Sequence, residues 1–145
     1  MLITAGDETA YNTMTASWGG LGVIWEKNVS TIVIRPSRHT LGFIEKEDYY
    51  TLSFFDKHYK KDLAYCGAYS GRDVDKAKET GLTPVFDAEA PYFAEASLVL
   101  ICRKIYQQKI DPKGFLDPGI DAGSYPMNDY HEAFVGEIVR VLKVN

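Results

Sequence analysis

Apolar and polar side chains alternate along several short stretches of the chain, and this alternation predicts β-strands. The clearest stretch, residues 29–35, is rich in β-branched residues and ends at Pro36, which cannot donate to a strand ladder. Residues 96–109 are ambiguous, because their length is typical of a helix and their composition of a strand; we predict a strand. The expected strands are residues 2–5, 12–17, 29–35, 49–55, 85–86, 92–93, 96–109 and 130–144.

Helical spacing of apolar side chains is confined to short segments. Apolar residues at positions i, i+4 and i+7 predict a helix within residues 56–69. Two shorter helices are expected over 40–46 and 73–79. We expect Ser70 or Asp73 to cap the start of the last helix and Gly81 to end it.

Glycines and prolines mark the expected breaks in regular structure. The segment Gly19 to Gly22 is expected to interrupt it, and residues 111–125 to form a loop with a short helical turn. Gly136 is expected at a bulge or a close approach of two chain segments. Many strands with few short helices predict a mainly β fold, an antiparallel barrel that is closed or partly open.

The composition favours one globular domain over residues 1–145, with an apolar fraction of 46%. A net charge of -4 disfavours nucleic acid as the main partner. No stretch is long and apolar enough to span a membrane, and the first residues do not resemble a signal peptide, so we expect a cytoplasmic protein. Cys66 and Cys102 lack a metal-ligand spacing, and we expect two reduced thiols and no metal.

Residues 12–18 place small hydroxyl and amide side chains along an expected strand that ends in an indole. Its side chains and backbone N–H groups can donate to the carbonyls and nitrogens of a planar ring with an amide edge. Trp18 can cover such a ring or pack against its tail. Taken alone, the segment also fits a polar edge strand with a tryptophan in the core.

Residues 35–40 bring two guanidinium groups and two hydroxyls together beside a proline. Arg38, Ser37 and Thr40 offer charge-assisted and neutral hydrogen bonds to a phosphate monoester. A solvated basic turn is the alternative, and Arg35, at the end of a strand, also fits an ion pair with an Asp or Glu. A ring-binding strand and a phosphate-binding turn together suit flavin mononucleotide (FMN) better than other common cofactors.

Four segments, residues 12–18, 35–40, 70–76 and 131–138, together resemble the flavin reductase-like family, which includes the flavoredoxins. The resemblance implies an FMN-binding split β-barrel of Greek-key type and a homodimer with the flavin near the subunit interface. Family members often carry additional residues before the first strand. The short start of this chain is expected to thin one edge of the barrel or to alter the dimer contact.

The resemblance also implies site residues. Asn12 and Trp18 are expected to contact the flavin, Arg38 and Thr40 its phosphate tail, and Lys76 to lie near the ring. No catalytic residue is assigned. The expected cofactor-binding residues are Asn12, Thr13, Met14, Thr15, Ser17, Trp18, Ser37, Arg38, Thr40 and Lys76.

Several of these side chains and their neighbours also fit structural roles. Lys76 fits an exposed ion pair with Asp73 or Asp75. His131 suits a supporting or substrate-side position, or simply a satisfied histidine. The tyrosines that fit either ring stacking or core packing are Tyr11, Tyr125 and Tyr130.

For function, the resemblance implies a flavoprotein that takes hydride from NADH or NADPH onto FMN. It would pass the electrons on to a small acceptor or a protein. The alternative is an FMN-binding electron carrier without its own NAD(P)H activity. A barrel that has lost the flavin, with a structural or haem-binding role, is disfavoured by the intact motif residues and the scarcity of axial ligands.

Overall fold

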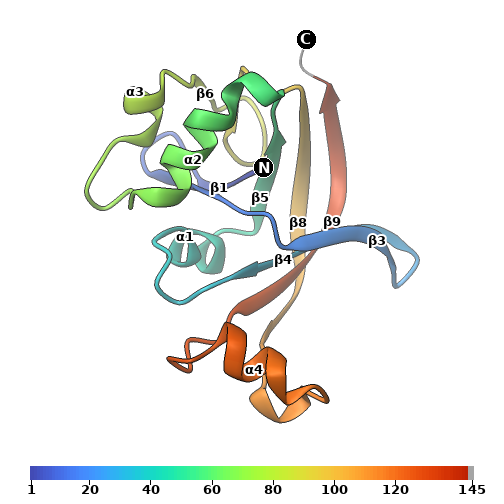
Figure 1. Cartoon of the computed structure of the whole chain (residues 1–145). Coiled ribbons are helices and arrows are strands. Elements are labelled where there is room, and N and C mark those ends of the chain that lie inside the picture. The colour runs from blue at the N-terminus through green and yellow to red at the C-terminus, as the bar shows by residue number, and fades with distance from the viewer. Residues whose placement is uncertain (144–145) are drawn as a thin grey trace.

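One antiparallel sheet dominates the computed structural model of the chain, which describes residues 1–143 (Figure 1). Its strands are β1 (Leu2–Gly6), β2 (Tyr11–Thr15), β3 (Gly19–Ile24), β4 (Lys27–Ile34), β5 (Tyr49–Phe54), β8 (Leu98–Lys109) and β9 (Glu132–Lys143). A small separate pair is formed by β6 (Pro84–Val85) and β7 (Tyr92–Phe93). The mainly β class predicted from the alternation is confirmed.

The seven strands follow the order β2-β1-β5-β8-β9-β4-β3, so β2 and β3 form the two edges. Only residues 16–18 connect these edges. Strands lie about 4.8 Å apart, so in a flat sheet the edges would be about 29 Å apart. The chain from Thr15 to Gly19 reaches at most about 14 Å. The sheet therefore has to curl into the predicted partly open barrel.

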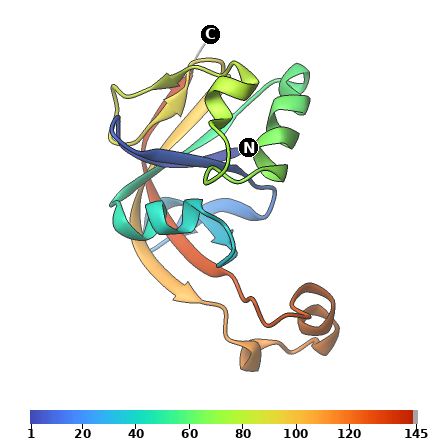
Figure 2. The ribbon, with the colours of Figure 1, turned by 90° about the vertical axis from the view of Figure 1, so that its left-hand side faces the viewer.

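Short helices cover parts of the sheet and connect its strands. The helix α1 lies in front of the sheet in Figure 2, and α4 lies beyond the ends of the long strands β8 and β9 (Figure 1). The predicted helices at 40–46 and 56–69 are confirmed, the second as a 3-10 turn followed by an α-helix. The helical segments are α1 (Thr40–Lys46), η1 (Lys57–Tyr59), α2 (Lys60–Ala68), α3 (Lys76–Thr80), η2 (Pro112–Gly114) and α4 (Pro118–Ser124).

The helix α3 begins later than predicted. Asp75, not Ser70 or Asp73, caps it, because the Asp75 side chain accepts a hydrogen bond from the backbone N–H of Lys78. The Ser70 hydroxyl instead accepts from the backbone N–H of Arg72 in the preceding turn. Gly81 ends the helix in the left-handed conformation, as predicted.

The predicted interruption at Gly19 to Gly22 is wrong, because these residues form most of β3. They pair in regular register with β4, from Gly19 opposite Ile32 to Ile24 opposite Lys27. All six residues of β3 are exposed, so the strand forms through backbone pairing and needs no side chains to fill a core. Gly19 has a φ of +130°, which favours glycine at the point where the chain enters the strand.

The ambiguous segment near residue 100 is a strand, as predicted. It forms β8, which pairs with β5 on one side and β9 on the other and is buried over its first half. Gly136 on β9 marks a close approach, since a Cβ atom there would lie 2.3 Å from the Tyr50 hydroxyl. The pairing register shifts beside it, between Lys104 and Tyr106. Val144, at the end of the predicted last strand, lies outside the described residues.

The main core lies between the curled sheet and α1. Its largest fully buried members include Ile3, Ile32, Tyr50 and Phe134. Cys66 and Cys102 are free, buried thiols in separate clusters of the core. The predicted loop at 111–125 carries η2 and α4. Within residues 1–143, no helix is long and apolar enough to cross a membrane.

Candidate cofactor-binding site

Two adjoining cavities lie beside β2 and the crossing that follows it. The first, here called the strand cavity, has a volume of about 190 Å³, and the second, the turn cavity, about 120 Å³. Met14 and Arg38 line both, so one ligand can extend through the two. The strand cavity is lined by residues that include Met14, Thr15, Ser17, Trp18, Arg38 and His131. The lining of the turn cavity includes Asn12, Ser37, Arg38, Thr40, Gly71 and Lys76.

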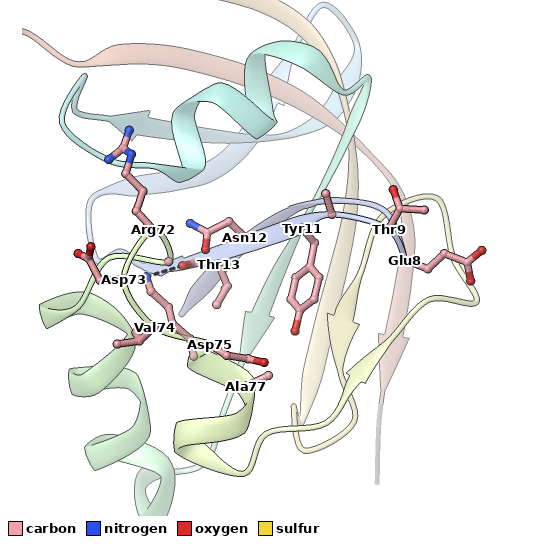
Figure 3. A pocket seen from close by; sticks show the side chains of 13 residues that line it. Glu8, Thr9, Tyr11, Asn12, Thr13, Arg72, Asp73, Val74, Asp75 and Ala77 are labelled. Carbon is pink, nitrogen blue, oxygen red and sulfur yellow. Dashed lines mark hydrogen bonds between the residues drawn. The ribbon is translucent and has the colours of Figure 1, made fainter.

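Nine of the ten residues predicted to bind a cofactor therefore line these two cavities. The tenth, Thr13, lines a third cavity of about 430 Å³ on the neighbouring side of β2 (Figure 3). The structure thus brings together segments that are 20 to 60 residues apart in the sequence. Whether each side chain touches a cofactor stays a prediction.

Asn12 links β2 to the start of α1. Its side-chain nitrogen donates to the Thr40 hydroxyl at 2.8 Å, and both side chains are buried. Gly71 lies directly against the same amide, since a Cβ atom at Gly71 would come within 1.9 Å of the Asn12 side-chain oxygen. The motifs 12–18, 35–40 and 70–76 therefore meet at the Asn12 side chain. Position 71 has to be glycine, because any larger residue would clash with Asn12.

Lys76 braces the outer edge of β2 and the end of α2. Only 6% of the residue is exposed, and its Nζ donates to the Thr13 carbonyl at 2.7 Å and the Cys66 carbonyl at 2.8 Å (Figure 3 draws the bond to Thr13). Burial lowers its pKa from the ordinary lysine value. The alternative of an exposed lysine paired with Asp73 or Asp75 is wrong.

The turn cavity has the chemistry of an anion site. Among the described residues that line it there is no Asp or Glu. Arg38 donates to the Gly67 carbonyl at 2.9 Å, which holds the guanidinium across the turn. Hydroxyls of Ser37, Thr40 and Ser70 line the same space. A cation surrounded by hydroxyl donors, without a competing carboxylate, fits a phosphate monoester.

The strand cavity ends in a cluster of aromatic side chains. Trp18 is 51% exposed, so it is not the core tryptophan of the alternative interpretation, and its ring lies 5.2 Å from that of His131. The Tyr125 hydroxyl lies 2.7 Å from Nδ1 of buried His131 and shares a hydrogen bond with it. Burial, reinforced by the charge of Arg35, lowers the pKa of His131, which favours a neutral imidazole at pH 7.

Arg35 is held by protein groups. It forms an ion pair with Asp129 at 2.7 Å and donates to the Ser124 carbonyl at 2.8 Å, so the ion pair considered for this residue is confirmed. Tyr125 and Tyr130 are buried against one another, with ring centres 4.8 Å apart. Tyr11 instead lines the third cavity.

Sequence reasoning missed some lining residues of these cavities. Val33, Ala68 and Tyr69 border them, and nothing in their local pattern distinguishes them from ordinary strand or helix residues. His39, which also borders the turn cavity, carries a weak signal, because it stands between Arg38 and Thr40 in the basic motif.

The two hydrogen bonds by which Lys76 links β2 to α2 can be tested through the free energy of unfolding. We expect Lys76→Met to lower the free energy of unfolding by about 1–3 kcal/mol, because two backbone carbonyls lose their donor. Lys78→Met, an exposed position on the same helix, serves as the control and is expected to change it by less than about 0.5 kcal/mol. Urea unfolding measures both. Equal effects of the two substitutions would contradict the assignment.

The model of the flavin reductase like domain matches residues 1–145 of the chain. Comparison with curated proteins gives no match.

Solved structures share the fold over 98% of the chain. They include the flavoredoxin of Desulfovibrio vulgaris (24% identity, TM-score 0.74, 67% of that chain) and an FMN-binding protein from Thermus thermophilus (22%, 0.74, 68%). A split-barrel protein from Shewanella frigidimarina is 23% identical, with a TM-score of 0.75 and 65% of its chain covered. The chain spans about two thirds of the length of these structures, and the fold is a split barrel. On the match along its whole length, the chain belongs to the flavin reductase-like domain family.

Proposed function

We propose that this protein binds FMN across the strand and turn cavities and acts as an NAD(P)H-dependent flavin oxidoreductase. The observation that carries the proposal is the continuity of the two cavities at Met14 and Arg38. The turn cavity offers the Arg38 cation with hydroxyl groups, which suit a phosphate tail. The strand cavity offers the edge of a strand beside the aromatic side chains of Trp18 and His131, which suit a planar ring.

The phosphate end is formed by the turn before α1. Arg38 neutralises charge on the phosphate, and the hydroxyls of Ser37 and Thr40 donate to its oxygens. Because Asn12 already donates to the Thr40 oxygen, the proton of that hydroxyl stays free to donate elsewhere. The buried amine of Lys76 adds positive potential to the same cavity.

The ring end follows the edge of β2 and the crossing to β3. The segment from Met14 to Ser17 lines the strand cavity. Its backbone groups, with the side chains of Thr15 and Ser17, would orient the amide edge of the ring. Trp18 and His131 limit access of water at the far end.

FMN, when bound, supplies the two-electron chemistry: it accepts hydride from NADH or NADPH and passes electrons to a small acceptor or a protein. The residues of this chain bind it, orient it and hold protons nearby. Because Nδ1 of His131 is engaged by Tyr125, its Nε2 is the ring nitrogen left to exchange a proton in the strand cavity.

We also propose that the protein forms a homodimer through the exposed arm made by β3 and the turn after it. Figure 1 shows this arm projecting from the body of the molecule. Leu21, Val23 and Trp25 on it are 61%, 70% and 57% exposed, and β3 is an edge strand with free backbone groups. Such a surface favours burial against a second copy. The arm begins directly after Trp18, so the partner would lie beside the strand cavity.

The phosphate contact predicts a selective loss of affinity. We expect Arg38→Gln to weaken FMN binding by about 10- to 100-fold, the value of one charge-assisted contact. Riboflavin lacks the phosphate, so its affinity should stay unchanged. Titration followed by flavin fluorescence measures both ligands, and Arg140→Gln, an exposed arginine that pairs with Glu89, is the control. An equal loss for FMN and riboflavin would contradict a phosphate role.

Reduction of the bound flavin by a nicotinamide donor is tested in the absence of oxygen. We expect NADH or NADPH to bleach the visible absorption of the FMN-loaded protein, and the more effective donor identifies the nicotinamide preference. Bound FMN that is reduced by dithionite but by neither nucleotide would instead support the electron-carrier alternative. Failure to bind FMN at all would reject both.

The dimer is tested by sedimentation. We expect the protein to sediment as a dimer, and Val23→Lys to convert it to a monomer, because a charge would be buried at the interface. Val141→Lys, at an exposed valine on the distant end of β9, is the matched control and should remain dimeric. A monomeric wild-type protein would refute the proposal.

A further inference from the structure

The segment between β8 and β9 leaves the barrel and returns to the strand cavity through one side chain, Tyr125. Figure 1 shows α4, which ends directly before Tyr125, beyond the ends of the two long strands. Most residues of the segment are exposed, but Tyr125 is only 5% exposed. Its hydroxyl lies 2.7 Å from Nδ1 of His131, which lines the strand cavity. A peripheral segment therefore contacts the lining of this cavity through a buried hydrogen bond.

The direction of this hydrogen bond follows from the surroundings of the Tyr125 hydroxyl. Within residues 1–143, Nδ1 of His131 is the one hydrogen-bond partner of that hydroxyl. If Nδ1 carried a proton and donated it, the buried hydroxyl proton would be left without an acceptor, which costs free energy. The hydroxyl therefore donates to Nδ1. In a neutral imidazole the single N–H proton then stands on Nε2.

Nε2 of His131 is open to the strand cavity. It makes no hydrogen bond with the described residues, and Ser53 Oγ is the only fully buried side-chain nitrogen or oxygen among them that lacks a partner. Nε2 thus keeps accessible surface. Because His131 lines the strand cavity, a ligand there meets an N–H donor at this ring and not an acceptor.

The charges around His131 favour the neutral imidazole. Burial and the positive charge of Arg35 lower its pKa, Asp129 opposes them, and Arg38 adds to the lowering. The Tyr125 phenol is a further titratable group against the ring. Arg35 and Asp129 also form an ion pair with each other at 2.7 Å, which limits the net charge beside the ring.

Arg35 holds Tyr125 in the position that the hydrogen bond needs. Its guanidinium lies over the Tyr125 ring, 5.1 Å from the ring centre. It also donates to the Ser124 carbonyl and pairs with Asp129, on both sides of Tyr125 in the sequence. The Tyr130 ring packs against that of Tyr125 with centres 4.8 Å apart. These contacts fix the phenol beside the imidazole.

We propose that Tyr125 is a positioning residue, which acts through His131 to present an N–H donor at Nε2 to the ligand of the strand cavity. The inference deepens the proposed function and rests on it, because that ligand would be the flavin. A neutral imidazole that donates a hydrogen bond stabilises negative charge on its acceptor. Because reduction adds negative charge to a flavin, His131 binds the reduced form more tightly than the oxidised one. Tyr125 thereby raises the electron affinity of the bound flavin from outside the cavity.

The tautomer can be observed without any ligand, because long-range proton–nitrogen NMR spectra distinguish a protonated imidazole nitrogen from an unprotonated one. We expect His131 of the ligand-free protein at pH 7 to carry its proton on Nε2. We expect Tyr125→Phe, which keeps the ring and removes the hydroxyl, to populate both tautomers. The signals that disappear in His131→Gln are those of His131.

The matched control is Tyr130→Phe, which removes from the same stack a hydroxyl that donates to Asp121. It should keep the wild-type tautomer. A proton on Nδ1 in the wild-type protein, or an unchanged tautomer in Tyr125→Phe, would overturn the proposal. Circular dichroism verifies the fold of each variant.

The effect on the flavin is measured as the affinity for reduced FMN relative to oxidised FMN, which follows from the midpoint potentials of bound and free FMN. We expect His131→Leu to lower this ratio about tenfold, the value of one hydrogen bond to a charged group. Tyr125→Phe should lower it about threefold, because Nε2 then carries the proton in only part of the population. His131→Gln places an amide N–H near the position of Nε2 and should recover most of the loss. Equal losses in His131→Leu and His131→Gln would refute the donor role.

The outcomes separate this inference from the proposed function. If the wild-type protein binds FMN and His131→Leu leaves the ratio unchanged, the donor role is overturned and the flavin site stands. If the wild-type protein binds no FMN, the proposed function fails, and the NMR spectra still confirm or overturn the positioning of His131 by Tyr125.

Discussion

The two edges of the sheet are joined by a very short connection, and this link determines how the sheet curls. Three residues, 16–18, join β2 to β3, although five strands lie between these strands in the sheet. A chain this short brings the two edges towards one another and forces the sheet to curl. The same three residues run from one edge of the sheet to the other. Ser17 and Trp18 therefore line the strand cavity.

Polar contacts then fix the surrounding loops against the exposed edge of β2. Lys76 donates to the Thr13 carbonyl, and Asn12 donates to the Thr40 hydroxyl. Because Gly71 has no Cβ atom, the segment 70–76 can approach Asn12 closely. The two buried donors, Lys76 and Asn12, thus each have an acceptor from a different segment. A half-satisfied arrangement would be less stable than an apolar one, so these contacts stabilise one arrangement of the loops. These contacts shape the turn cavity, because Asn12, Thr40, Gly71 and Lys76 all line it.

Much of this could be predicted from the sequence. Alternation and composition identified every described strand except β3, including the ambiguous one near residue 100, and the order of four motifs indicated the family. The interruption expected at Gly19 to Gly22 failed because backbone pairing with β4 outweighs the low strand propensity of glycine. The exposure of Trp18 and the burial of Lys76 were also beyond sequence reasoning. Both are set by how distant segments pack, which local patterns do not encode.

We propose that one flavin extends through both cavities with its phosphate at Arg38. A crystal structure of the protein with FMN would show whether it does. It should place phosphate oxygens within about 2.7–3.2 Å of the Arg38 guanidinium and the hydroxyls of Ser37 and Thr40, with the ring along Met14 to Trp18. A flavin found in the third cavity of Figure 3, or a phosphate remote from Arg38, would contradict this arrangement.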